Sequence, residues 1–253
     1  MSDPTMEQLL TAGAHFGHKK EKSHPKMREF TYGIRNGIYV IDLAKTIEAL
    51  KAAREYLKTA VAEGKTILFV GTKRQARDVI KRVATALGQP YITVRWLGGT
   101  LTNFETILKS ISTLDELEAE IKEMEGKELQ ISKKAYHRLS DRYHRLLERY
   151  EGIRTLKHLP DILFVVDTVT ENVAVGEAER MEIPVVAIID TNGNPQDITY
   201  PIPANDDSKD ALSLLLENIR DVIVKPKKLE RIKKEEKEKV DKTLKKSGVK
   251  KKM

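Results

Sequence analysis

The sequence predicts an α/β fold: a Rossmann- or flavodoxin-like parallel sheet of five strands, an inserted antiparallel coiled-coil hairpin and a basic C-terminal tail. Short continuous apolar runs, typical of strands covered on both faces, alternate with segments whose apolar residues recur at steps of three and four. Two heptad-like segments interrupt this alternation after residue 104, and lysine dominates from residue 225. A chain of 253 residues, 40% of them hydrophobic, is long enough to bury a core.

Five apolar runs are the predicted strands of the sheet: residues 38–41, 66–70, 91–94, 162–166 and 183–189. The helical patterns between them indicate a doubly wound, parallel arrangement. Asp42 is the expected N-cap of the helix after the first run, and Gly88 is the expected end of the helix after the second. Asp206 or Asp207 is the expected N-cap of a last helix with an apolar face between residues 212 and 222.

We divide the chain into four parts. Residues 1–37 hold a short helix, which Thr5 and Gln8 begin with the spacing of a capping box, followed by a basic loop arm. The other parts are the α/β domain at 38–104 and 151–224, the coiled-coil hairpin at 105–150 and the lysine-rich tail at 225–253. Both hairpin helices keep heptad steps, with these members: Ile107, Leu114, Leu117, Ile121, Met124, Tyr136, Leu139, Tyr143, Leu146 and Tyr150.

The stretch RWLGGTLTN at residues 95–103 joins the α/β domain to the hairpin and contains the only tryptophan. Two glycines before a helix start are compatible with a phosphate loop, as is the turn at Gly71 after the second predicted strand. Neither place has the GxxxxGK[ST] or GxGxxG pattern, however. We therefore interpret residues 95–103 as a junction in which Trp96 packs the root of the hairpin and Gly98 and Gly99 permit the turn.

Positive charge is concentrated at two places. The net charge is +7, and residues 225–253 contribute fourteen basic and five acidic side chains. Such a tail favours a polyanionic partner, with a solubilising role as the alternative. In the N-terminal segment we expect stacking on unpaired bases or sugar faces from His18, Phe30 and Tyr32, with His24 as a further stacking residue. We expect phosphate contacts from its basic residues, which are Lys19, Lys20, Lys22, Lys26, Arg28 and Arg35. A second predicted group is Lys73, Arg74 and Arg77, which a solvated helix face explains equally well.

Acidic residues that follow predicted strands raise the alternatives of catalysis and metal binding. A structural divalent ion such as zinc or magnesium has His18, Asp190, Asp206 and Asp207 as its candidate ligands. Aspartates at strand ends also cap turns, and no nucleophile motif accompanies these. We therefore expect no enzyme activity, no small-molecule substrate and no cofactor, with the metal left open.

The sequence contains no cysteine, which excludes disulfides, thiolate zinc sites and cysteine nucleophiles. Its first twenty residues have no signal-peptide character, and no window has the length and apolar content of a membrane span. We expect a soluble cytoplasmic protein without a membrane partner.

Taken together in order, several motifs resemble the bacterial small-subunit ribosomal protein S-two family. They are HFGH at 15–18, PKM at 25–27, IRNGIYVIDLAKT at 34–46, FVGTKRQA at 69–76, RWLGGTLTNF at 95–104, LPDILFVVD at 159–167, IPVVAIIDTN at 183–192 and IPANDD at 202–207. The resemblance implies a Rossmann-like body with a coiled-coil protrusion that binds small-subunit ribosomal RNA in the cytoplasm. It also implies neighbouring ribosomal proteins as partners, including ribosomal protein S-one, whose docking supports translation initiation.

Overall fold

The computed structural model describes residues 3–126 and 133–224, so the lysine-rich tail lies outside the described residues. Its centre is a parallel sheet of five strands in the order β5-β4-β6-β7-β8. The strands are β4 (Ile67–Val70), β5 (Tyr91–Ile92), β6 (Ile162–Val166), β7 (Val185–Ile189) and β8 (Tyr200–Pro203). The first strand of the sheet therefore has its second on one side and its third on the other, which is the flavodoxin-like order. The predicted fold class is confirmed.

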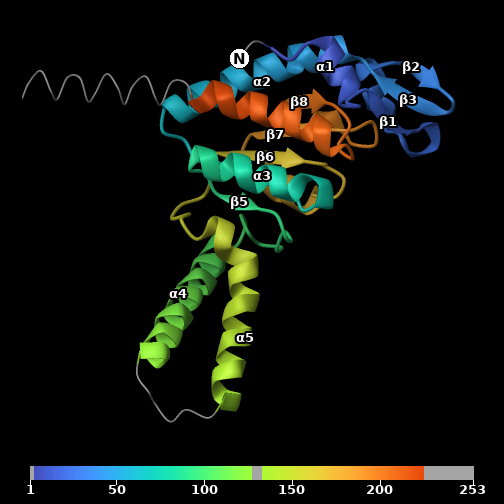
Figure 1. The fold of residues 1–253 in the computed structure, drawn as a ribbon. Helices are drawn as coiled ribbons and strands as arrows, with labels where there is room; N and C mark the ends of the chain where they lie inside the picture. Colours follow the sequence, from blue (N-terminus) through green and yellow to red (C-terminus); the bar gives the residue numbers. More distant parts are fainter. Residues whose placement is uncertain (1–2, 127–132, 225–253) are drawn as a thin grey trace, which may run out of the picture.

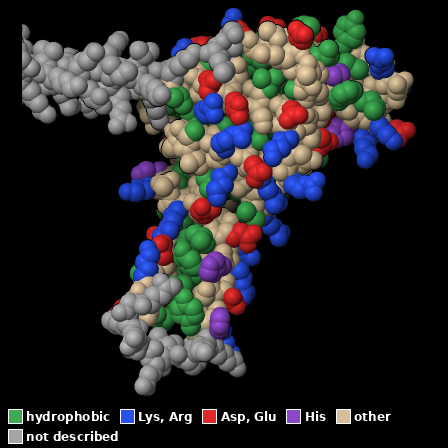
Figure 2. All heavy atoms as spheres, viewed as in Figure 1, with side chains coloured by type: hydrophobic (Ala, Val, Ile, Leu, Met, Phe, Trp, Pro, Cys, Tyr) green, Lys and Arg blue, Asp and Glu red, His purple; other side chains and the backbone are tan. Residues whose placement is uncertain are grey.

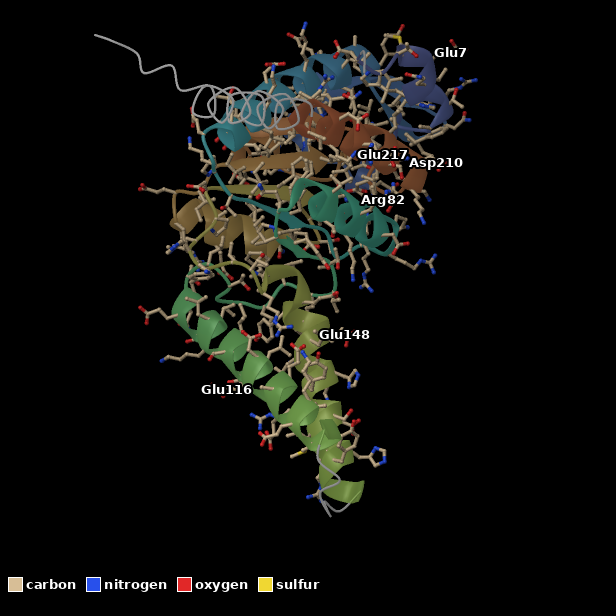
Figure 3. All side chains as sticks on the ribbon, turned by 60° about the vertical axis from the view of Figure 1, so that its left-hand side comes forward. Glu7, Arg82, Glu116, Glu148, Asp210 and Glu217 are labelled. Atoms are coloured by element: carbon tan, nitrogen blue, oxygen red, sulfur yellow. The ribbon has the colours of Figure 1, made fainter. Side chains whose placement is uncertain are left out.

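Helices cover both faces of this sheet (Figure 1). Ile67 and Phe69 point into one core, together with the helices α1 (Met6–Thr11), α2 (Leu43–Ala62), α3 (Arg74–Leu87) and residues 209–224. Leu68 and Val70 point into the other, with α6 (Asn172–Arg180) and the root of the arm. On the first face Arg82 of α3 pairs with Glu217 of the last helix at 2.5 Å (Figure 3).

One of the five predicted strands does not belong to the parallel sheet, and a strand that was not predicted takes its place. Residues 38–41 form β3, which is not part of the parallel sheet. The fifth strand is instead β8, which was not predicted and which contains Pro201 and Pro203. Proline removes a ladder donor and is tolerated at a sheet edge, and β8 is the edge strand next to β7.

The N-terminal segment is more ordered than a loop arm. Strands β1 (Phe16–Lys19) and β2 (Thr31–Arg35) both pair antiparallel with β3 (Ile38–Ile41), giving the order β1-β3-β2. Asn36 and Gly37 connect β2 to β3 with φ of 52° and 77°, which is the Asn-Gly turn that favours a tight hairpin. The short helices η1 (Lys20–Lys22) and η2 (Pro25–Phe30) lie between β1 and β2. The predicted domain boundary at residue 37 separates β3 from β1 and β2, with which β3 pairs, and this boundary stays a prediction.

Several predicted helix ends are confirmed. The Thr5 and Gln8 capping box is present at α1, the Asp42 side chain accepts a hydrogen bond from the Ala44 amide at the start of α2, and Gly88 ends α3 with φ of 65°. The predicted cap of the last helix is wrong. Ser208 is in that position, its hydroxyl accepting from the Ala211 amide, because Asp206 is engaged elsewhere.

The inserted segment forms an arm of two helices, α4 (Phe104–Gly126) and α5 (Lys133–Tyr150), which extends away from the sheet (Figure 1). Ile107, Leu114 and Tyr150 are buried near its root and belong to the second core. Farther out, Ile121 and Leu139 are only half-buried. The root is therefore part of the folded body, and most of the arm depends on its own helix pair.

One carboxylate holds the junction between this arm and the body. Glu177 of α6 is 4% exposed. Its Oε1 accepts from the Trp96 indole at 3.0 Å and the Gly99 amide at 2.7 Å, and its Oε2 accepts from the Leu101 and Thr102 amides at 2.9 and 3.1 Å. Burial acts to raise the pKa of Glu177, but these hydrogen bonds outweigh it and lower the pKa. The predicted junction thus depends on an acceptor that lies far away in the sequence and that no local motif indicates.

We expect Glu177→Gln to lower the free energy of unfolding by about 3 kcal/mol or more, because one amide oxygen cannot serve all of these donors and each buried donor left unpaired costs about 1–3 kcal/mol. Urea unfolding followed by the fluorescence of Trp96, the only tryptophan, measures this loss. Glu179→Gln on the exposed side of the same helix is the control and should change stability by less than about 0.5 kcal/mol. Equal effects of the two substitutions would contradict the role of Glu177.

Candidate nucleic-acid interface

The predicted basic residues of the N-terminal segment all lie at the surface. Their side chains are exposed on β1, η1, η2 and β2, and within the described residues none of them forms an ion pair; they are Lys19, Lys20, Lys22, Lys26, Arg28 and Arg35. In contrast, lysines such as Lys58, Lys65 and Lys81 are paired with glutamates at 2.8–3.0 Å. The unpaired cations are the ones available to phosphates.

This basic segment is fixed against the loop between β7 and β8. The His24 amide donates to the Thr191 carbonyl at 2.7 Å, and His24 Nδ1 accepts from the Lys26 amide at 3.3 Å. The Lys26 ammonium contacts the side chain of Gln196 in η4 (Pro195–Asp197). His24 is half-buried, so one part of its ring packs inward while the lysines on either side face solvent.

The second predicted group divides in two. Arg74 and Arg77 are exposed at the start of α3, and Arg77 donates through Nε to the Thr72 carbonyl at 2.7 Å. Figure 2 shows Lys and Arg side chains over this part of the molecule and beside the arm, interspersed with acidic ones. Lys73 is different, because its side chain is only 20% exposed and points among carboxylates. The structure does not bring Lys73 together with the exposed cations.

The ammonium of Lys73 lies 2.6 Å from Asp206, 2.7 Å from Asp207 and 3.1 Å from Asp167. Burial disfavours its charge, but the contacts with Asp206, Asp207 and Asp167 prevail and raise the pKa of Lys73. The cluster connects the turn after β4 with the carboxyl ends of β6 and β8. These residues form an internal charge network, which gives the aspartates at these strand ends a structural role that requires no catalysis.

The four candidate metal ligands do meet at this network. His18 Nδ1 lies 3.1 Å from Asp190, and His18 Nε2 lies 3.9 Å from Asp207. The hydrogen bond to Asp190, aided by its charge and those of Asp206 and Asp207, raises the pKa of His18. Among the residues that the structure describes, no group of three or more His, Asp or Glu side chains has the arrangement that holds a metal ion. A divalent ion would also have to compete with the ammonium of Lys73, and the metal stays a prediction.

Asp206 is the most strongly shifted acid of the network. It is fully buried, and burial, followed by the charges of Asp167 and Asp190, raises its pKa to about 7 in spite of the contact with Lys73. A second buried acid, Glu171, accepts a hydrogen bond from the Thr72 amide at 2.6 Å, and burial raises its pKa. Both stabilise the turn after β4, and neither was assigned this role from the sequence.

We expect the stability of the protein to fall as pH rises from about 4 to about 7, because the folded state holds the proton of Asp206 more tightly than the unfolded state, where the carboxyl has an ordinary pKa near 4. Asp206→Asn should flatten the fall of the urea midpoint between pH 5 and pH 8. Some slope should remain, since the raised pKa of His18 acts in the same direction. The exposed Asp210→Asn is the matched control, and a flattening of equal size there would contradict the assignment (Figure 3).

Comparison with known proteins bears on this surface. The model of the family described as "Ribosomal protein S2" matches residues 9–226. The chain is 47% identical over 224 residues to a protein of Coprothermobacter proteolyticus named small ribosomal subunit protein uS2, which covers 88% of this chain and 83% of the relative. Proteins of the same name from Campylobacter concisus and Salinispora tropica are 46% and 45% identical, covering 89% and 85% of this chain and 85% and 72% of their own lengths.

The match extends over the basic N-terminal segment, both layers of helices and the arm. None of the helices in the described part of the chain is long and apolar enough to cross a membrane. Ribosomal proteins of this kind are structural components and not enzymes, and they work at the ribosome in the cytoplasm. The family inferred from the motifs is therefore confirmed: the chain belongs to the ribosomal protein S2 family.

Proposed function

We propose that this protein is a structural constituent of the small ribosomal subunit and binds small-subunit ribosomal RNA through its N-terminal segment. The observation that carries this proposal is the set of exposed, unpaired cations on β1, η1, η2 and β2. They lie on a segment that is held to the body by β3 and by the contact of His24 with Thr191. A cationic surface on a fixed scaffold binds phosphates without a large ordering cost.

Arg74 and Arg77 extend this proposed surface along the start of α3. Lys73 is not included, because three carboxylates already neutralise its charge. The arm contributes less to a purely electrostatic surface, since exposed acids such as Glu116 and Glu148 lie on its two helices (Figure 3). RNA binding by the protein should thus depend on the N-terminal segment more than on the arm.

We further propose that the protein helps to dock ribosomal protein S-one and thereby supports initiation. The support is an apolar groove, defined by Leu10, Phe16, Tyr32, Ile34 and Val40, which encloses about 750 Å³ beside the small sheet. Phe16 is 53% and Tyr32 85% exposed, more than large apolar side chains of a body surface usually are. In this proposal the ring of Tyr32 contacts a protein partner instead of an unpaired base.

For RNA binding, we expect the triple substitution of Lys20, Lys22 and Lys26 by Gln to reduce the slope of log affinity against log salt by about 2, because each phosphate contact contributes about 0.7–0.9 to that slope. Filter binding of the full chain to small-subunit ribosomal RNA at several salt concentrations measures it. The control replaces Lys58, Lys65 and Lys122 by Gln, which removes the same charge from lysines that are paired with glutamates. If both triple variants change the slope alike, the N-terminal segment is not the phosphate-binding surface.

For docking, Phe16→Ser together with Ile34→Ser should weaken binding of purified ribosomal protein S-one about tenfold or more, since burying two such side chains typically contributes a few kcal/mol. The measurement is co-sedimentation of ribosomal protein S-one with small subunits that contain the variant. The same variant should keep the salt slope of RNA binding, because it removes no charge. Undiminished co-sedimentation would show that the groove is not the docking surface.

A further inference from the structure

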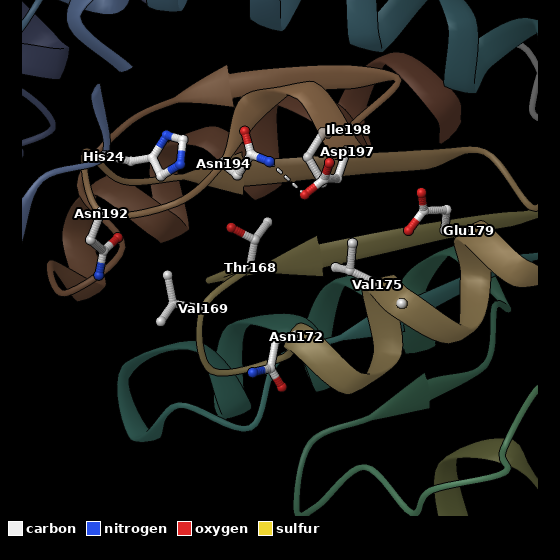
Figure 4. A pocket seen from close by; sticks show the side chains of 11 residues that line it. His24, Thr168, Val169, Asn172, Val175, Glu179, Asn192, Asn194, Asp197 and Ile198 are labelled. Atoms are coloured by element: carbon white, nitrogen blue, oxygen red, sulfur yellow. Dashed lines mark hydrogen bonds between the residues drawn. The ribbon is translucent and has the colours of Figure 1, made fainter. Parts of the chain in front are cut away.

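A second cavity lies at the carboxyl ends of β6 and β7, next to the basic segment. It encloses about 330 Å³, and its lining includes His24, Thr168, Asn172, Asn192 and Asp197 (Figure 4). In parallel α/β sheets the loops at this edge are where ligands bind. A volume near the lower limit for small-molecule pockets suits a single ring system and is too small for a dinucleotide.

Two buried polar atoms in this cavity have no partner in the described chain. They are the hydroxyl oxygen of Thr168 and the amide oxygen of Asn192. Thr168 is 9% exposed, and the backbone at Gly193 packs against it so closely that a Cβ there would lie 2.5 Å from the hydroxyl. Buried polar groups are normally hydrogen-bonded, so these two groups indicate a ligand that donates to the Asn192 oxygen and forms a hydrogen bond of either direction with the Thr168 hydroxyl.

Other polar groups of the lining are held in place by bonds within the loop. Asn194 Nδ2 donates to Asp197 Oδ2 at 2.7 Å, and Asn194 Oδ1 accepts from the Gln196 amide at 3.3 Å (Figure 4). His24 is similarly oriented by the Lys26 amide. These side chains are therefore set before any ligand arrives, which lowers the entropy cost of binding.

The charges of the cavity differ from those around it. Glu179 and Asp197 line it, and no lysine or arginine does. Such an interior repels phosphate and favours a neutral group rich in donors. Lys22 and Lys26, in contrast, are exposed on either side of His24, which belongs to both the lining and the basic segment. Basic residues beside a neutral or acidic interior fit an RNA strand whose backbone stays outside while one base enters.

We propose that this cavity binds one unpaired base of the bound RNA, and that guanine is the base it fits. Guanine presents two adjacent donor groups, N1–H and the exocyclic N2 amine, to oxygens such as those of Thr168, Asn192 and Asp197. Adenine and cytosine offer only an amine beside a ring acceptor, and uracil only one N–H. This inference rests on the RNA binding proposed above. The proposed surface contacts phosphates, and the cavity would add a site that recognises a base.

Gly176 provides the test, since it lines the cavity and a Cβ added to it meets nothing within 4 Å. Gly176→Leu should fill the cavity, and Gly176→Ala is the matched control; both favour the helix over glycine. The full chain is bound to small-subunit ribosomal RNA, and unpaired guanines are probed with kethoxal, which modifies N1 and N2. We expect the wild type and Gly176→Ala to protect one guanine at similar protein concentrations. Half-protection of that guanine by Gly176→Leu should require about tenfold more protein. The salt slope of filter binding should be unchanged.

Thr168→Val is the second variant. It keeps the side-chain volume and removes a hydroxyl that has no partner in the described chain, so folding should be preserved while guanine protection weakens. Equal guanine protection by wild type and Gly176→Leu overturns the inference. It is also overturned if Gly176→Leu impairs only assembly with other ribosomal proteins, because the cavity would then bind a protein side chain. Absence of any RNA binding by the wild type would instead overturn the proposed function.

Discussion

The arm and the body depend on one buried carboxylate. Glu177 accepts hydrogen bonds from five donors in residues 96–102, so the chain that leaves the sheet toward α4 is attached to α6, which lies more than seventy residues later in the sequence. Burying a carboxylate is costly in itself, and only several simultaneous hydrogen bonds make its charged form stable there. The lowered pKa of Glu177 reflects this balance. Gly99, with φ of 90°, allows the backbone to turn its amide toward the same acceptor.

A second, partly buried charge has a comparable function at the carboxyl edge of the sheet. Lys73 joins the turn after β4 to Asp167 and Asp206, so that three loops at one edge of the sheet are tied by a single ammonium. Removing one member of such a network leaves an uncompensated charge, which makes the arrangement specific even where its net stabilisation is small. These aspartates suggested catalysis or metal binding from sequence alone, and their contacts give them a structural role.

The sequence was most informative where one physical requirement dominated. Strands such as Ile162–Val166 are covered on both faces, so a continuous apolar run identifies them. The run at Ile38–Ile41 has the same composition but pairs in the small sheet, and no local pattern distinguishes these two outcomes. Within the candidate interface, exposure of the N-terminal lysines followed from charge density alone. The roles of Lys73 and Glu177 did not, because each depends on partners that are distant in sequence and meet only in the fold.

The proposed interface divides its work between two kinds of residue. Exposed lysines hold a phosphate backbone wherever its charge lies, so they give affinity but little discrimination among sequences. Discrimination requires hydrogen-bonding atoms that are fixed and shielded from water, as the oxygens of Thr168 and Asn192 are. His24 belongs to both parts, since its backbone is bonded to Thr191 and its ring faces the cavity. A strand bound by these lysines would therefore present its bases beside a cavity that contains unsatisfied acceptors.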